Sequence, residues 1–134
     1  MSLFRRRARI ETKTADELRA MRGAGLVVAD TLALARERAV AGVSTRELDG
    51  LAEEAIRSAG ALPSFLGYHG FTGSLCISVN DEVVHGVPGE RVLREGDLVS
   101  VDCGAIVEGW HGDAAVTFVV GGRRHGSAAD LALM

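Results

Sequence analysis

Residues 98–120 read LVSVDCGAIVEGWHGDAAVTFVV, two runs of β-branched and small apolar residues separated by Glu108-Gly109. A two-residue turn that ends in glycine favours an antiparallel hairpin, because glycine readily adopts the positive φ that such turns need. We therefore predict paired strands over residues 98–106 and 113–120.

Two aspartates interrupt these apolar strands. In the predicted register Gly104 lies opposite Asp113 and Ala115 opposite Asp102, so both carboxylates share one face as diagonal neighbours, about 7 Å apart or less. Buried carboxylates this close repel unless a cation lies between them, and hard divalent ions take oxygen ligands. The pair indicates a divalent-metal site; alternatively, both side chains face solvent or each caps a turn. Cys103 alternates to the opposite face and is predicted to be core.

An earlier stretch, residues 75–85, predicts a second hairpin. Its strands are residues 75–79 and 82–85, and Asn80-Asp81 supplies the turn. This pairing would set Cys76 opposite His85. Because Gly86-Val87-Pro88 follows, His85 is placed at a strand end on the rim of a site, although a histidine in a hairpin can equally be a satisfied core or surface residue.

A glycine-rich loop, Gly67-Tyr68-His69-Gly70-Phe71, precedes these strands. Its two aromatic residues suit the wall of a substrate pocket, and the same composition also suits an ordinary turn. His111 shares a strand face with Asp113, next to the turn, and is interpreted as structural.

Helices are predicted on both sides of the strands. Capping boxes at residues 14–17 and 44–47 begin two helices, which Gly42 and Gly60 end. Ser127 caps a third helix that stops within a turn or two. This suggests a larger fold that is cut partway.

The composition fits one soluble α+β domain: 134 residues, 47% hydrophobic, 25% charged, with a formal net charge of −3. Two cysteines exclude a disulfide scaffold and a four-cysteine zinc site. There is no signal-peptide pattern and no run long enough to span a membrane, so a cytoplasmic protein is expected. The negative charge argues against nucleic acid as the main partner. Residues 1–13 are interpreted as a basic arm, with a ribosome- or RNA-binding patch as the alternative.

Four ordered motifs resemble the type I methionine aminopeptidases of peptidase family M24, in particular the actinobacterial members. They are YHGF (68–71), CISVNDEVVHGVP (76–88), GDLVSVDCG (96–104) and GWHGD (109–113), and the match is nearly unbroken from about residue 10 to residue 122. The resemblance implies the α+β pita-bread (creatinase/aminopeptidase) fold, a curved antiparallel sheet with helices on one face. Residues 14–134 would be the N-terminal half of its catalytic domain.

The resemblance also implies a set of site residues. Asp102 would bind one metal through both oxygens and Asp113 would bridge two metals. His85 would be catalytic, contacting the substrate and stabilising the transition state. The substrate pocket or its approach would be lined by Tyr68, His69, Phe71, Cys76 and His85. Phe71 stands where a tyrosine is common, and Gly104 stands where several members have threonine.

The implied activity is metal-assisted removal of the N-terminal methionine from nascent proteins, with two divalent ions (Mn, Fe(II), Co or Zn) as cofactors. The ribosome is a further candidate partner, and a complete protein is expected to be a monomer. The family completes its site with two histidines and two glutamates from a second half. No glutamate follows Asp113 here, so we expect a truncated chain that is inactive alone. The alternatives are another pita-bread hydrolase, such as an Xaa-Pro aminopeptidase, or a non-catalytic pita-bread binding module.

Overall fold

The computed structural model describes residues 10–134. Residues 1–9 of the basic arm predicted over 1–13 therefore lie outside the described residues. Helix α1 spans Ala15–Arg38 and helix α2 spans Thr45–Ser58, and both predicted capping boxes are present. In the second box, Glu47 N donates to Ser44 Oγ at 3.2 Å and Ser44 N donates to Glu47 Oε2 at 2.8 Å. Helix α1 ends before Gly42, whose φ of +98° serves the turn into α2 instead.

Four antiparallel strands form one sheet around a central strand. They are β1 (Leu62–Pro63), β2 (Leu75–Val79), β3 (Leu98–Val107) and β4 (Trp110–Val119). Strand β3 pairs with β1 and β2 on one side and with β4 on the other. The hairpin of β3 and β4 has the predicted register, with Asp102 opposite Ala115 and Gly104 opposite Asp113.

The second predicted hairpin is wrong. Residues 82–85 form no strand, and β2 pairs with β3, which sets Cys76 opposite Asp102 rather than His85. On the edge of β2 away from β3, the Ser78 hydroxyl takes the place of a backbone partner: it donates to Val83 O at 3.3 Å and accepts from Gly86 N at 3.0 Å. His85 also has a φ of 70°, which is not the extended backbone of a strand.

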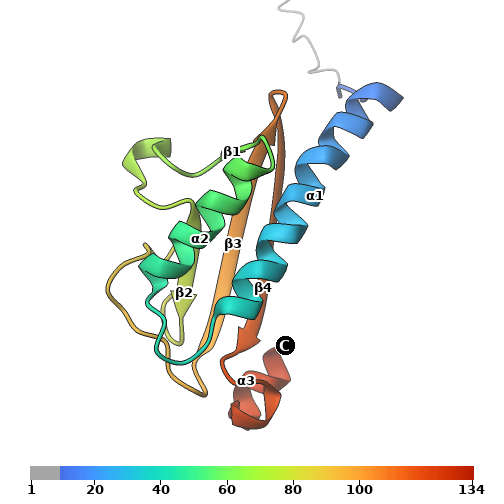
Figure 1. Ribbon diagram of the computed structural model, residues 1–134. Coiled ribbons are helices and arrows are strands. Elements are labelled where there is room, and N and C mark those ends of the chain that lie inside the picture. Colours follow the sequence, from blue (N-terminus) through green and yellow to red (C-terminus); the bar gives the residue numbers. More distant parts are fainter. Residues whose placement is uncertain (1–9) are drawn as a thin grey trace, which may run out of the picture.

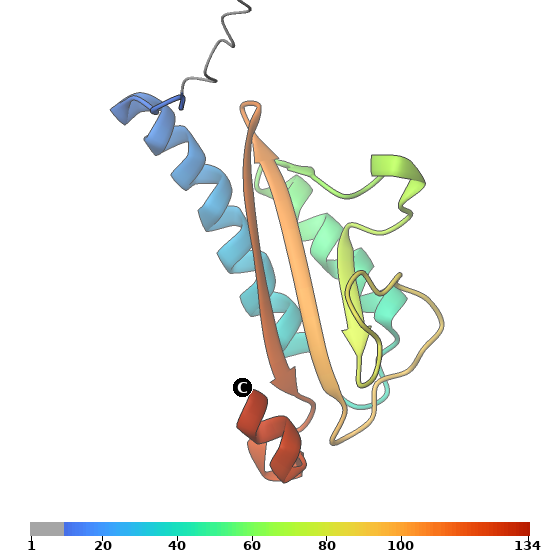
Figure 2. The ribbon, with the colours of Figure 1, turned by 180° about the vertical axis from the view of Figure 1, so that it is seen from behind.

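Helices α1 and α2 cover one face of the sheet, and the other face carries no helix over β3 and β4 (Figures 1 and 2). The core lies between these layers and includes Val99, Val101, Cys103 and Ala105 of β3, as predicted for Cys103. Asp102 alternates to the face without helices. A short helix, α3 (Ala128–Leu133), follows β4 and is capped by Ser127 as predicted.

Close packing of α1 on β4 depends on Gly112. A Cβ at this position would lie 2.7 Å from the carbonyl carbon of Ala24 and from the nitrogen of Gly25, both in α1. A side chain there would force α1 or the strand to shift. Among the helices between residues 10 and 134, none is both long and apolar enough to cross a membrane.

Candidate metal and substrate site

The two aspartates lie on the sheet face that the helices leave uncovered. They share a cavity of ≈ 290 Å³ with five other side chains. These are Phe65, Tyr68, Phe71, Cys76 and His85. The structure thus brings together six of the seven residues selected from the sequence, and it adds Phe65.

Asp102 is a partly buried carboxylate that lies near a second carboxylate, Asp113. Its Oδ1 is buried and has no hydrogen-bond partner among the described residues. Burial raises the pKa of this carboxyl group, and the negative charge of Asp113 raises it further. A buried oxygen without a donor is costly unless something positive binds it.

Asp102 and Asp113 lack a positive partner, and a divalent cation would supply one. Two neighbouring carboxylates are the donor set that hard divalent ions prefer, and the cation would neutralise the repulsion between them. Within residues 10–134, however, no group of three or more His, Cys, Asp or Glu side chains is arranged to hold a metal. The described residues therefore supply part of a coordination shell.

Cys76 lines the cavity from β2 and lies directly opposite Asp102 on the neighbouring strand. Its thiol is buried, and burial together with the charges of Asp102 and Asp113 raises its pKa to about 11. At neutral pH the group is a neutral thiol. It therefore contributes to the pocket as a small apolar side chain rather than as a nucleophile.

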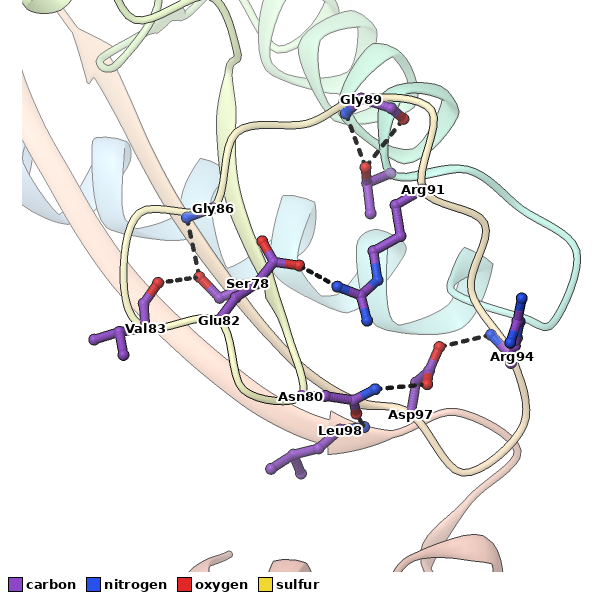
Figure 3. A network of polar contacts seen from close by, with 11 residues as sticks. Ser78, Asn80, Glu82, Val83, Gly86, Gly89, Arg91, Arg94, Asp97 and Leu98 are labelled. Atoms are coloured by element: carbon purple, nitrogen blue, oxygen red, sulfur yellow. Dashed lines mark hydrogen bonds and ion pairs between the residues drawn. The ribbon is translucent and has the colours of Figure 1, made fainter.

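The loop that carries His85 is fixed against β2 on both sides of the histidine (Figure 3). Ser78 Oγ accepts from Gly86 N at 3.0 Å and donates to Val83 O at 3.3 Å, and Ile77 N donates to Gly86 O at 2.9 Å. A Cβ on Gly86 would lie 2.0 Å from Ile77 O, so only glycine fits there. His85 itself has a φ of 70°, and these anchors hold it in that conformation at the cavity.

Further polar contacts hold the segments on either side of this loop, residues 80–82 and 89–91 (Figure 3). Asn80 Nδ2 donates to Asp97 Oδ1 at 2.9 Å, and Arg91 pairs with Glu82 at 2.6 Å. Thr45 of α2 accepts from Gly89 N at 2.9 Å through its hydroxyl. The position of His85 is thus set by contacts that run from the start of α2 to the start of β3.

Asp49 of α2, which belongs to none of the sequence motifs, fixes the start of β2. Its Oδ1 accepts from Ser74 N at 2.9 Å and from Leu75 N at 2.7 Å. Burial raises the pKa of this carboxyl group, while the two N–H donors oppose the rise. Asp49 places the residue before Cys76 and so helps to set one wall of the cavity.

Phe65 was also missed, although the strand opposite it gives a signal. A Cβ on Gly104 would lie 2.8 Å from both Phe65 Cε1 and Ser64 Cβ, so the missing side chain at 104 leaves room for this loop. Glycine inside an apolar strand often marks close approach of another segment. Ser64 Oγ also lies 3.1 Å from His111 Nδ1.

His69 is the one selected residue that does not line the cavity. It belongs to a short 3-10 turn, Tyr68–Gly70, and has a φ of 48°. Its ring packs edge-on against Tyr68, with 4.3 Å between centroids. His69 therefore contacts a pocket residue without reaching the pocket.

Comparison with known proteins identifies the family that this chain resembles. A model of metallopeptidase family M24 matches residues 19–133. Methionine aminopeptidase 1 from Mycobacterium tuberculosis (strain CDC 1551 / Oshkosh) is 53% identical over 122 residues, which are 90% of this chain and 46% of that protein. Methionine aminopeptidase 1 from Bacillus subtilis (strain 168) is 53% identical over 81% of this chain and 44% of its own length. The chain spans about half the length of the curated relatives it matches.

Solved structures show the same similarity. The methionine aminopeptidase from Thermotoga maritima superposes with a TM-score of 0.87 at 40% identity, over 93% of this chain and 49% of that one. The prolidase from Pyrococcus furiosus superposes with a TM-score of 0.72 at 27% identity, over 81% and 31%. The expected α+β fold, the N-terminal half of the pita-bread architecture, is confirmed by these likenesses.

Proposed function

The chain belongs to metallopeptidase family M24, and from this membership we propose that it supplies the first half of a methionyl aminopeptidase site. The observation that carries the proposal is the pair of Asp102 and Asp113 in one cavity, with a buried oxygen of Asp102 that has no donor among the described residues. The reaction is hydrolysis of the peptide bond after an N-terminal methionine.

The two aspartates would hold divalent ions, with Mn, Fe(II), Co and Zn as candidates. Ions bound there would supply Lewis acidity, polarising the scissile carbonyl and lowering the pKa of the attacking water. A free α-amino group has a lone pair that can bind near such ions, whereas the nitrogen of an internal peptide bond does not. This makes the activity that of an exopeptidase.

The remaining cavity residues would bind the substrate. Phe65, Phe71, Tyr68 and the neutral thiol of Cys76 form an apolar wall suited to an unbranched thioether side chain. His85 lies beside them and would donate a hydrogen bond to the charge that develops on the reacting peptide group. His69 would act only through its contact with Tyr68.

Nascent proteins are the natural source of N-terminal methionine. We therefore place this activity in the cytoplasm, with the ribosome as a candidate partner. The likeness to a prolidase at 27% identity supports a second candidate, cleavage of Xaa-Pro bonds. The relatives that are 53% identical favour methionine release instead.

A chimera tests the proposal, because this chain matches about half of each relative. Residues 19–133 replace the matching segment of the Mycobacterium tuberculosis relative, and methionine release from Met-Ala-Ser is measured with added Mn²⁺. Asp113→Asn should lower the rate at least about 100-fold, since loss of a metal ligand exceeds the 10–100-fold typical of its outer partners. Glu54→Lys, exposed on α2, is the matched control and should not change the rate.

Three results would count against the proposal. A folded chimera that keeps its activity with Asp113→Asn would exclude the metal role. A chimera that releases residues only from Xaa-Pro peptides would favour the prolidase reading. A chimera that binds Mn²⁺ but cleaves neither peptide would favour a non-catalytic module.

A further inference from the structure

One carboxylate outside the cavity binds the backbone that joins two of the residues lining it. Asp49 lies on α2, and its Oδ1 accepts from Ser74 N at 2.9 Å and from Leu75 N at 2.7 Å. Phe71 precedes this bonded pair by one short stretch of loop, and Cys76 follows it directly. Both Phe71 and Cys76 line the cavity. A displacement of the bonded backbone would therefore move both side chains relative to the aspartate pair.

The two N–H groups depend on Asp49 for their acceptor. Ser74 and Leu75 are each 0% exposed, so solvent does not take the place of the carboxylate. The hydroxyl of Ser74 is also buried and has no hydrogen-bond partner among the described residues, so this side chain does not anchor the segment. Hydrogen bonds from N–H groups to a carboxylate are stronger than those to a neutral acceptor. Asp49 is thus the polar side chain that fixes where β2 begins.

The backbone held by Asp49 also contacts the loop of His85. A Cβ added at Gly73, the residue before Ser74, would lie 2.8 Å from Pro88 Cδ. Pro88 belongs to the same loop as His85, so the proline ring rests on the segment that Asp49 holds. A shift of this segment would therefore displace the His85 loop as well.

A second residue of α2 holds the end of that loop, one helical turn before Asp49. Thr45 and Asp49 are at positions i and i+4, which places both side chains on one face of α2. The Thr45 hydroxyl donates to Gly89 O at 3.1 Å and accepts from Gly89 N at 2.9 Å (Figure 3). One face of α2 thus holds two segments of the chain, and each of them carries residues of the cavity.

We propose that Asp49 is a positioning residue for the substrate pocket. Its carboxylate holds the start of β2 so that Phe71 and Cys76 present a wall of fixed shape to the methionine side chain. Asp49 acts through the backbone, because it lies in the helix layer while Asp102 faces the other side of the sheet (Figure 1). The inference rests on the proposed aminopeptidase function, since it assigns how that substrate is selected.

The proposed metal-binding carboxylates should not depend on this contact. Asp102 and Asp113 lie on β3 and β4, which pair with each other along their whole length. Loss of the Asp49 carboxylate should therefore change how the substrate side chain fits and leave the affinity for Mn²⁺ unchanged. A misplacement of about 1 Å can cost about 100-fold in rate. Pockets for apolar side chains discriminate between similar groups by about 10–200-fold, so a tenfold loss of selectivity is the expected scale.

The same chimera tests the positioning role with two substrates. The ratio of kcat/KM for Met-Ala-Ser to kcat/KM for Leu-Ala-Ser measures selectivity, and it does not change when part of the enzyme is unfolded. Asp49→Ala should lower this ratio at least about tenfold, with the Mn²⁺ affinity unchanged. Asp49→Asn keeps an oxygen acceptor and should restore the ratio to within about threefold of wild type. Glu54→Ala, at an exposed position of α2, is the matched control and should leave the ratio unchanged.

An unchanged ratio in Asp49→Ala, or no recovery in Asp49→Asn, would overturn the positioning role. If Asp49→Ala does not fold, Asp49→Glu, which moves the carboxylate by one methylene group, should still lower the ratio, and an unchanged ratio there would overturn the role equally. A wild-type chimera that cleaves neither peptide would contradict the proposed function instead. Amide exchange then tests the contact alone: Asp49→Asn should protect Ser74 N and Leu75 N better than Asp49→Ala or Asp49→Glu, and equal exchange rates would refute the contact.

Discussion

Gly112→Ala should destabilise the chain, because the new methyl group would meet the backbone of α1. Its Cβ would lie 2.7 Å from the Ala24 carbonyl carbon and from Gly25 N, and 2.8 Å from Ala24 O, where ordinary contact begins near 3.4 Å. No side chain can rotate to make room. Helix α1 must therefore move by about 0.7 Å, or the strand must bend.

The expected cost follows from overpacking, which typically destabilises by about 1–3 kcal/mol. Replacing a strand glycine offsets about 0.5–1 kcal/mol of this. The net loss of unfolding free energy is then about 1–2 kcal/mol. With a urea dependence of about 1–3 kcal/mol per molar, the unfolding midpoint should fall by about 1 M.

Urea unfolding followed by circular dichroism measures this change. Gly50→Ala is the matched control, since Gly50 lies in α2 with nothing within 4 Å of an added Cβ. The same substitution there should stabilise the chain by about 0.5–1 kcal/mol. If Gly112→Ala raised the unfolding midpoint as Gly50→Ala is expected to do, or left it unchanged, then α1 does not lie as closely on β4 as described.

Two further predictions concern the loop and a helix cap. Ser78→Ala leaves the buried Gly86 N–H without its acceptor. The substitution should lower the free energy of unfolding in urea by about 1–3 kcal/mol and speed amide exchange near His85. Unchanged exchange at residues 83–86 would contradict this account of the loop. The pKa of Glu47 is lowered mainly because its carboxylate accepts a hydrogen bond from the backbone N–H of Ser44. A second hydrogen bond, from the Ser44 hydroxyl, lowers it further. Its contribution is therefore present above the ordinary glutamate pKa and lost as pH falls through the lowered value. Glu47→Gln should lose less stability between pH 6 and pH 3 than wild type, and equal losses would show that the cap does not depend on this charge.

The parts of the fold that the sequence predicts are those set by local rules. The hairpin of β3 and β4 has its register fixed by a two-residue turn, and both Glu108 and Gly109 have positive φ. Once that register is fixed, the shared face of Asp102 and Asp113 follows from the alternation of side chains. The helix starts follow equally from their capping boxes.

The errors have two causes. Asn80-Asp81 forms a turn whether or not residues 82–85 return as a strand, and here bonds of the Ser78 hydroxyl to Val83 O and Gly86 N replace a backbone ladder. Phe65 was missed because its neighbour Gly104 lies 39 residues later in the chain.

The two faces of the sheet have opposite energetic roles. The helix-covered face buries Val99, Val101 and Ala105 and supplies hydrophobic stabilisation. The other face buries an oxygen of Asp102 without a donor among the described residues and places a second carboxylate beside it, which opposes folding. Such a group is explained better by a ligand that it binds than by the stability of the fold. We therefore propose that the uncovered face of the sheet, rather than its core, carries the functional site.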